Sequence, residues 1–382
     1  MKIQIELTPL EPYFLGNERG MAYGEVKTQR ALANPYYIKS SRMPTQSAMF
    51  GVLRYLGIKS PTSDFNLTPE DQKNIGRESF QLLQAEEKTE EKTEEKAEEK
   101  QSFGRIKSIS PVVLLNQQDE VLVAAPRNLY PDENKKFVPF QRFCEVLSGS
   151  DGRSRWLPEE YNEKNYESGG FFNLSTGAVE MDLFSTQTRV GINREMQRAE
   201  KDTGNKGFFK KEYVILKSGY RFMIQAEVEE EFLLSDTRTV FMGQGRTAFS
   251  VCIRKVSANI PWQGLDRVFP TVRETGCYLY VKSDLYFSGR MEQLRDGCMF
   301  SLTDSQEHRG FMTRYGSGNA ESRYRKSPVL LRLIQAGSVF VFQNREQRQD
   351  FIWLLEQSDS FEHGQKAGFN QIYMAGEGTN ES

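Results

Sequence analysis

Histidine and cysteine are scarce in this 382-residue chain, which holds two histidines and four cysteines. Histidine is the side chain most often poised for proton transfer near neutral pH, so a histidine mechanism has to use His308 or His363. Both lie in polar segments that contain glycine, which predicts exposed loop positions. The cysteines are scattered without a CxxC pair, so neither a zinc site nor a disulfide framework is indicated. We expect buried free thiols at Cys144, Cys252, Cys277 and Cys298.

Long apolar runs are also missing. No segment approaches the roughly 18 to 20 apolar residues that a membrane-spanning helix needs. The first residues, MKIQIELTP, have neither the basic nor the apolar region of a secretory signal. We therefore expect a soluble, cytoplasmic protein without a membrane partner.

The familiar motifs of enzyme sites are absent from the sequence as well. Gly243 and Gly245 form a GxG, but the dinucleotide-binding fingerprint needs a third glycine and a following helix, whereas a strand pattern follows here. The chain has no Walker A sequence, no HExxH and no GxSxG. No carboxylate cluster lies in the apolar context that a metal site would need. We therefore predict no catalytic residue, no metal site and no cofactor.

A four-residue Glu/Lys repeat, EEKTEEKTEEKAEEK, occupies residues 86–100. Its period of four places like charges at i and i+4, which is repulsive on a helix. We expect a mobile insertion or a frayed helix over residues 85–101. The repeat carries a net charge of −4, so the rest of the chain has +2, although the whole chain has −2. The folded part is thus slightly basic.

The remaining pattern predicts an α+β protein with two domains, because 382 residues are enough for two cores of ordinary size. Helices are expected after Thr45, with an N-cap there and an end at Gly57, and also at residues 291–295 and 344–357. Strands or hairpins are expected at residues 2–7, 111–125, 213–228, 239–256, 277–287 and 328–343. Strands, one helix and more strands, roughly twice over, are typical of a pair of ferredoxin-like units, although other mixed topologies share this order.

Basic, glycine-punctuated segments fall between these elements. Glycine lets a backbone N–H approach a phosphate, Arg and Lys neutralise it, and Tyr or Phe can stack on an unpaired base. Their position in loops favours single-stranded or shaped RNA over the major groove of DNA. The segments are residues 16–42, 189–211, 243–246, 308–326 and 364–378.

The richest of these segments, residues 186–213, has seven Lys or Arg residues against four acidic ones. Strand patterns flank it, and Gly204 and Gly207 interrupt it. This predicts a long basic hairpin that projects from a sheet. The alternative to a binding hairpin is a solvated surface loop, whose charges only keep the chain soluble.

Two motifs near the start point to a family. Pro9, Pro12, Tyr13 and Phe14 form a proline turn with two aromatic residues, and Pro44, Thr45, Ser47, Gly51, Leu53 and Arg54 mark a helix that begins P-T-x-S and continues G-x-L-R. Together they resemble the start of the RAMP-superfamily subunits of type III CRISPR effectors. Residues 189–222 are similar to that family's GIxR segment and the hairpin after it. Residues 241–249 are similar to its glycine turn before a strand.

This resemblance is strongest to the Cmr-type (III-B) member that caps the 5′ end of the CRISPR RNA. It implies tandem ferredoxin-like (RRM-like) domains with long insertions, one over residues 1–256 and one over 257–382. It implies that the chain is not an enzyme but grips the 5′ handle of the CRISPR RNA, with residues 186–212 as a thumb. The implied partners are the CRISPR RNA, the large polymerase-like subunit, the first backbone subunit and, indirectly, the target RNA. The Glu/Lys repeat has no family role, and the final glycine loop is sparser than usual.

The basic loops and the resemblance together give a set of candidate RNA-binding residues. They are Arg19, Arg30, Lys39, Arg42, Ser47, Arg54, Arg189, Asn193, Arg194, Arg198, Lys206, Lys210, Lys211, Gly243, Gln244, Gly245, Arg246, Lys366 and Asn370.

Three other functions remain open on the sequence. The chain could be the equivalent 5′-capping subunit of another type III subtype, or a RAMP-fold endoribonuclease that processes precursor CRISPR RNA. The late position of both histidines counts against the nuclease, because that family often uses a histidine near the N-terminal domain. An unrelated interaction module with solvated basic loops is the third alternative.

Overall fold

The computed structural model describes most of the chain and has a mixed α+β fold with mostly antiparallel sheets, as predicted. The described residues are 1–16, 36–59, 67–76, 103–140, 143–146, 155–159, 169–192, 208–243, 246–269, 277–308, 312–315, 323–326, 331–358 and 361–375. The expected Glu/Lys insertion lies outside these ranges.

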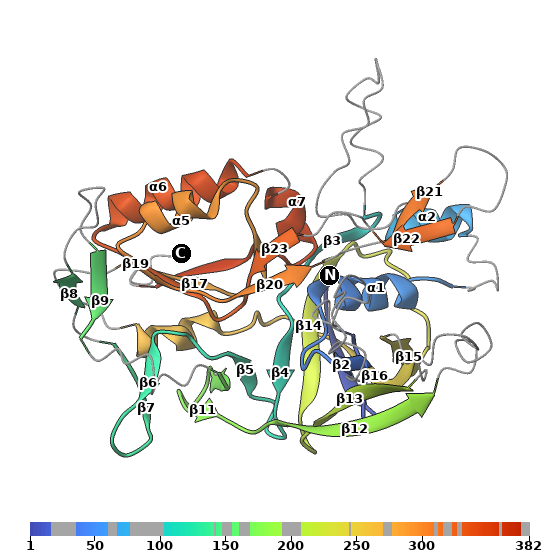
Figure 1. Ribbon diagram of the computed structural model, residues 1–382. Coiled ribbons are helices and arrows are strands. Elements are labelled where there is room, and N and C mark those ends of the chain that lie inside the picture. Colours follow the sequence, from blue (N-terminus) through green and yellow to red (C-terminus); the bar gives the residue numbers. More distant parts are fainter. Residues whose placement is uncertain are drawn as a thin grey trace, which may run out of the picture.

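A nine-stranded sheet forms the centre of the N-terminal half (Figure 1). Its interior strand β1 pairs antiparallel with β14 on one side and with β16 on the other. Alternation along β1 buries Ile3, Ile5 and Leu7 completely on one face, which fixes the register of the strand. In spatial order the strands are β11 (Val179–Glu180), β10 (Phe171–Asn173), β5 (Val121–Ala124), β4 (Val113–Leu115), β14 (Arg221–Val228), β1 (Lys2–Pro9), β16 (Thr247–Lys255) and β15 (Thr239–Met242), with β3 (Ile106–Ile109) also beside β14.

Helix α1 (Gln46–Leu56) packs on the buried face of this sheet and has the predicted ends. The Thr45 side chain accepts a hydrogen bond from the Ala48 N–H at 3.3 Å, and the Gly57 N–H closes the last turn on the Leu53 carbonyl. The buried residues of α1 are Gln46, Met49, Phe50, Val52, Leu53 and Leu56. Helix α2 (Pro69–Ile75) follows.

A four-stranded sheet with helices on one face forms the C-terminal half. Along the chain its elements run β17 (Cys277–Val281), α5 (Met291–Asp296), β19 (Phe300–Leu302), β24 (Val339–Phe342), α6 (Arg345–Glu356) and β25 (Ile372–Ala375). The strands lie in the order β25-β17-β24-β19, all antiparallel. Helices α5 and α6 cover the same side of the sheet in Figure 1, and the predicted positions of both helices are confirmed.

One core joins the two halves. Tyr278, Tyr280 and Val341 of the C-terminal sheet pack in a single buried cluster with strands β4, β5, β10 and β14 and with η2 (Trp262–Val268). The Tyr280 hydroxyl donates a hydrogen bond to the Ala124 carbonyl at 2.7 Å. The predicted domain boundary lies at residue 256. The segments that follow it, η2 and β17, pack in the core that both halves share.

Several short elements complete the described fold. A three-stranded sheet runs β18-β23-β20, and three two-strand ladders lie at the periphery. These elements are β18 (Leu285–Tyr286), β20 (Ser305–His308), β23 (Leu331–Ile334), β21 (Met312–Tyr315), β22 (Arg323–Lys326), β6 (Leu129–Pro131), β7 (Phe137–Pro139), β8 (Phe143–Val146), β9 (Arg155–Pro158) and α7 (Phe361–Lys366).

The predicted hairpin at residues 111–125 is confirmed by the pairing of β4 with β5, but two other hairpins and one strand need correction. The turn at Gly219 leads from β13, in a separate sheet, into β14 of the central sheet, so these strands do not pair with each other. The run at 328–343 likewise divides into β23 and β24 of different sheets. The strand at 277–287 breaks at Ser283 and Asp284, whose polar groups bond to neighbouring loops in place of a ladder partner.

The expected environments of histidine and cysteine are also partly wrong. His308 ends strand β20 and is buried beside Phe369, and His363 lies in α7 against the ring of Phe103. Of the four cysteines, Cys298 is buried and Cys277 is half-buried, whereas Cys144 and Cys252 are exposed on their strands. None of the helices in the described part of the chain is long and apolar enough to cross a membrane.

Candidate nucleic-acid interface

The basic hairpin predicted at residues 186–212 begins as a ladder of two long strands. Strand β12 (Phe184–Ile192) pairs antiparallel with β13 (Phe208–Leu216) over nine residue pairs, and β2 (Tyr36–Lys39) adds parallel to β13. Figure 1 shows β12 running along the edge of the molecule, below the N-terminal half in this view. The ladder places Arg189 opposite Lys211 and Val190 opposite Lys210. The part of the hairpin between these strands lies outside the described residues.

Cations and aromatic rings alternate on this sheet. The three strands carry Arg189, Lys210, Lys211 and Lys39 against a single carboxylate, Glu212. The Arg189 guanidinium lies 4.6 Å from the centre of the Tyr213 ring, and the Lys211 ammonium lies 5.2 Å from the centre of the Phe14 ring. The side chains of residues 185–190 are all exposed. A strand exposed in this way offers positive charge to an anionic polymer, and the Arg189 guanidinium is held over the half-buried Tyr213 ring.

The proline-turn motif holds the base of the hairpin. Tyr13 forms a two-way backbone bridge with Val214, with N···O distances of 2.8 and 2.9 Å. Its hydroxyl donates to the Arg42 carbonyl at 2.5 Å, and the ring is completely buried against Phe222 and Phe249. Burial raises the pKa of the Tyr13 hydroxyl far above its usual range, and the nearby Arg42 charge opposes this only in part. Tyr13 therefore stays a neutral hydrogen-bond donor that ties three segments together.

The glycine turn between β15 and β16 closes on the same motif. Gly243 has φ +74°, and a Cβ there would lie 2.1 Å from the Phe14 carbonyl oxygen, so only glycine fits without a backbone shift. On the other strand of the turn, the Thr247 hydroxyl accepts a hydrogen bond from the Phe14 N–H at 3.4 Å. Arg246, at φ +48°, is exposed at this turn. Phe14 is thus held from both ends of the β15–β16 hairpin.

The structure brings seven of the candidate residues to one region and places four others elsewhere. Lys39, Arg42, Arg189, Lys210, Lys211, Gly243 and Arg246 all lie on or beside the β12–β13–β2 sheet and its anchor. Arg19, Arg30, Asn193, Arg194, Arg198, Lys206, Gln244 and Gly245 lie outside the described residues.

The four residues placed elsewhere have partners within the fold. Arg54 donates to the Ile75 and Gly76 carbonyls at the end of α2, and the Ser47 hydroxyl lies 3.1 Å from that of Thr45. Lys366 pairs with Glu362 along α7 at 3.3 Å. Asn370 is completely buried, with φ +54°, and its side chain accepts from the Tyr286 N–H and donates to the Phe361 carbonyl. In this structure Asn370 supports the packing of its loop.

Three contributors to the site were not identified as such from the sequence. Tyr213 provides the ring beneath Arg189, Ser40 accepts from the Leu15 N–H at 3.0 Å, and Thr247 bonds to Phe14. A tyrosine next to a Lys-Lys-Glu run was the only available signal. Ser40 and Thr247 gave none, because their roles depend on contacts over long sequence distances.

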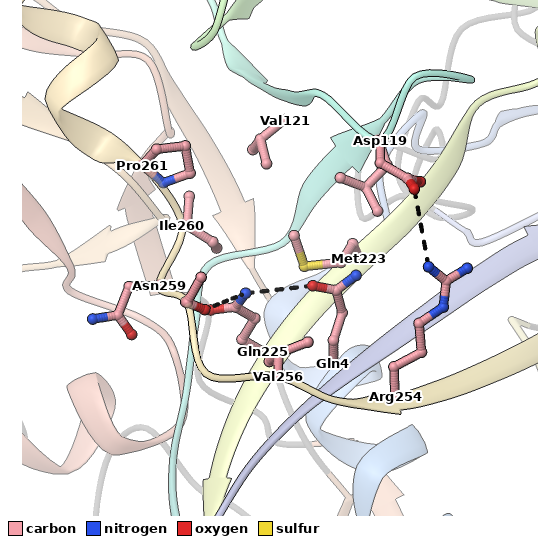
Figure 2. Close-up of a pocket in the computed structure, with 12 residues that line it drawn as sticks. Gln4, Asp119, Val121, Met223, Gln225, Arg254, Val256, Asn259, Ile260 and Pro261 are labelled. Atoms are coloured by element: carbon pink, nitrogen blue, oxygen red, sulfur yellow. Dashed lines mark hydrogen bonds and ion pairs between the residues drawn. The ribbon is translucent and has the colours of Figure 1, made fainter.

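A second feature is a shallow hollow of about 230 Å³ on the outer face of the central sheet (Figure 2). Its floor includes Met223 and Ile260, and its rim carries amide side chains and Arg254. The Gln225 amide nitrogen donates to the Gln4 side chain at 3.4 Å and to the Ala258 carbonyl at 3.2 Å, so these amides bind one another. The Asp119 carboxylate at the hollow pairs with Arg221 and lies 4.0 Å from the Arg254 guanidinium.

Within the described ranges, no group of three or more His, Cys, Asp or Glu residues could hold a metal ion. No known family model matches the sequence, and no curated protein does. Among solved structures, a chain of the Type III-B Cmr-beta complex bound to cognate target RNA is similar at 14% identity and a TM-score of 0.47. A chain of the same complex bound to target RNA and AMPPnP is similar at 12% identity and a TM-score of 0.45. Each comparison covers 97% of this chain and 96% of the other. At these scores the likeness assigns neither a family nor a function.

Proposed function

We propose that this chain is a non-catalytic, RNA-binding subunit of a type III-B CRISPR-Cas effector that works in the cytoplasm. It recognises the 5′ handle of the CRISPR RNA and bridges the large polymerase-like subunit to the first backbone subunit in antiviral defence. One observation carries the proposal. Three motifs spread over more than 200 residues of the sequence meet at the base of one exposed basic hairpin: Tyr13 with Phe14, Arg189 with Lys211, and Gly243 with Arg246.

The base of the hairpin suits a single-stranded RNA. Arg189 and Lys211 each lie over an aromatic ring, which limits their motion and orients their positive charge before RNA binds. Phosphates bind such cations, and unpaired bases stack on exposed rings or on the guanidinium plane. The β2 strand and the Tyr13 bridge keep this surface in one orientation relative to the central sheet.

Both histidines support a role without catalysis. His308 packs within 6.2 Å of the Phe369 ring, and His363 packs within 5.0 Å of the Phe103 ring. Neither belongs to the elements that form the basic hairpin and its anchor. RNA would therefore be bound here and cut, if at all, by other subunits of the assembly.

Two ferredoxin-like domains, at residues 1–256 and 257–382, are part of the proposal. The C-terminal elements β17-α5-β19-β24-α6-β25 follow the β-α-β-β-α-β order, and their strands have the spatial order fourth, first, third, second. In the N-terminal half, β16-β1-β14-β4 repeats this spatial order with α1 after the first strand. A segment without a helix, residues 229–238, stands where the second helix would be.

The test is binding of the full chain to a repeat-derived single-stranded RNA and to a scrambled RNA over a salt series. We expect preferential binding without cleavage. The variant Arg189→Ala/Lys210→Ala/Lys211→Ala should lose roughly 10- to 100-fold in affinity, with a salt slope shallower by about 2, because each phosphate contact on a single strand contributes about 0.7 to that slope.

A matched control removes three exposed cations from other elements: Lys107→Ala/Lys136→Ala/Arg295→Ala. This variant should bind as the natural chain does. Equal affinity of the hairpin variant and the natural chain would contradict the assignment of the hairpin. Cleavage of the repeat RNA would favour the endoribonuclease instead.

A further inference from the structure

The most exposed large apolar side chain in the described part of the chain is Phe241, which is 67% exposed. It lies on β15, the last strand at this side of the nine-stranded sheet. Strand β15 alternates, so that Val240 and Met242 are buried in the core while Phe241 lies on the outer face. Because the core does not use this ring, the fold alone does not account for a phenylalanine at the position.

Phe241 belongs to an apolar row that crosses three strands. It stands opposite Ala248 of β16, and the Leu10 N–H, just after β1, donates to the Ala248 carbonyl at 3.1 Å. Directly opposed residues of antiparallel strands share one face of the sheet. Leu10, which is 60% exposed, therefore lies beside Ala248 and in line with Phe241 on the outer face. We call these three residues the outer row.

The turn beside the outer row is fixed to the anchor of the basic hairpin. Gly243, two residues after Phe241, lies against the Phe14 carbonyl, and the Thr247 hydroxyl accepts from the Phe14 N–H. Lys211 of the hairpin lies over the Phe14 ring. At about 3.3 Å per residue, Phe241 is about 7 Å along the strand from Gly243, which two stacked nucleotides span at about 3.4 Å each. An RNA strand held at the base of the hairpin can therefore place a base over the outer row.

The size and charge of this surface favour a nucleobase over a protein partner. Arg246 is exposed at the β15–β16 turn and forms no ion pair within the described ranges, whereas the acidic Glu11 follows Leu10 at the β1 end of the row. A protein interface of ordinary size covers about 800 Å² on each partner, of which two exposed large apolar side chains are a small part. One exposed ring is enough to stack on one base.

We infer that Phe241 is a base-stacking residue, on which an unpaired base of the RNA bound at the basic hairpin packs beside Leu10 and Ala248. Arg246 binds the adjoining phosphate. The inference rests on the proposed function, because it takes the same RNA as its ligand. Stacking on Phe241 adds affinity for unpaired RNA without reading the sequence, because every base has a ring face and only an unpaired base can leave its neighbours.

The test is binding of the full-length variant Phe241→Ala to the repeat-derived single-stranded RNA over a salt series. Its affinity should fall about 5- to 100-fold, which is the range for the loss of one stacked base. Its salt slope should stay unchanged, because no phosphate contact is lost. Phe241→Tyr keeps the ring and should bind as the natural chain does. The matched control Trp353→Ala removes another exposed aromatic side chain, on α6, and should also bind normally.

The outcomes separate this inference from the proposed function. If Phe241→Ala binds RNA with unchanged affinity while the triple variant of the basic hairpin loses affinity, the inference is overturned and the proposed function stands. The same holds if Phe241→Ala keeps its RNA affinity but no longer binds a partner subunit, which would assign the outer row to a protein. A loss accompanied by a shallower salt slope would show that the ring only positions cations. If the natural chain binds no RNA, the proposed function itself fails.

A second readout reports stacking itself. A set of RNAs with 2-aminopurine at successive single-stranded positions is bound to the natural chain at saturating protein concentration. The fluorescence should be quenched at one or two positions, and Phe241→Ala should restore the emission there while Trp353→Ala leaves it quenched. Equal quenching in the natural chain and in Phe241→Ala at every position would contradict stacking on this ring.

Discussion

Four strands of the N-terminal sheet, β16-β1-β14-β4, have the same spatial order as the four strands of the C-terminal sheet, but the two sheets differ in how their faces are covered. In the C-terminal sheet, Leu279 and Phe340 pack under α5 and α6, while Tyr278 and Val341 on the opposite face pack against the N-terminal half. In the N-terminal sheet, strands β4, β5, β10 and β14 also pack against the C-terminal half, but β1 has one face buried under α1 and carries Gln4 and Glu6 on the other. The C-terminal sheet is thus packed on two apolar faces, whereas the polar face at β1 contains the buried Glu6, which pairs with Arg221 and Arg254.

Removing a large side chain from the doubly covered sheet should have the largest effect. Phe340→Ala leaves a cavity beneath Phe351, whose ring centre lies 4.8 Å away, and should reduce the free energy of unfolding by about 3 to 5 kcal/mol. Phe241→Ala on β15 is the matched control, because Phe241 is 67% exposed and should change stability by less than about 0.5 kcal/mol. Urea unfolding measures both, and equal losses would show that the two sheets do not differ as described.

A pH-dependent contribution to stability is expected from Asp284, at the break between β17 and β18. Burial raises the pKa of the Asp284 carboxyl from 3.8 to about 6, although the Ala336 N–H and the Gln306 amide donate to it. Because the folded state holds this proton more tightly than the unfolded chain, the stabilisation is greatest below pH 4 and is lost as pH rises to about 6. The change should reach about 3 kcal/mol. Urea unfolding of Asp284→Asn across this range should show a flatter profile, and a slope equal to that of the natural chain would refute the assignment.

A smaller effect is expected at the polar face of β1. The Glu6 carboxylate accepts from the Arg221 guanidinium at 2.6 Å and lies 3.5 Å from that of Arg254, although the Glu6 side chain is only 3% exposed. Glu6→Gln keeps the shape but removes the charge, and should cost about 1.5 to 3 kcal/mol. Asp119→Asn, at the exposed end of the same network, should cost at most about 1 kcal/mol. Urea unfolding at low and high salt measures the loss of stability in each variant. Similar losses in Glu6→Gln and Asp119→Asn would show that burial of Glu6 does not strengthen its ion pairs.

The sequence predicted local features well, because they depend on neighbouring residues. The Thr45 cap, the β4–β5 hairpin and helices α5 and α6 all follow from capping, periodicity and turn residues. The base of the basic hairpin was predicted because strand patterns flank the charged segment.

Pairing between distant strands could not be predicted in the same way. Nothing in the run around Gly219 distinguishes a hairpin from a turn that passes the chain to another sheet. The same limit applies to Asn370, whose glycine-rich surroundings indicate an exposed loop although the side chain fills a buried position. Resemblance to a family grouped the motifs of Tyr13 and Gly243, but their contact through Phe14 required coordinates.

The place of β1 between β14 and β16 also has a consequence for synthesis on the ribosome. Lys2 pairs with Glu227 and Ile3 with Lys255, so β1 is synthesised more than 200 residues before either of its partners. At roughly 5 to 20 residues per second, that delay is on the order of 10 to 45 seconds. Throughout it, Ile3, Ile5 and Leu7 form an unpaired apolar edge, a hazard for association between nascent chains. Strand β1, which pairs on both sides in the folded protein, is thus exposed to association with other nascent chains during translation.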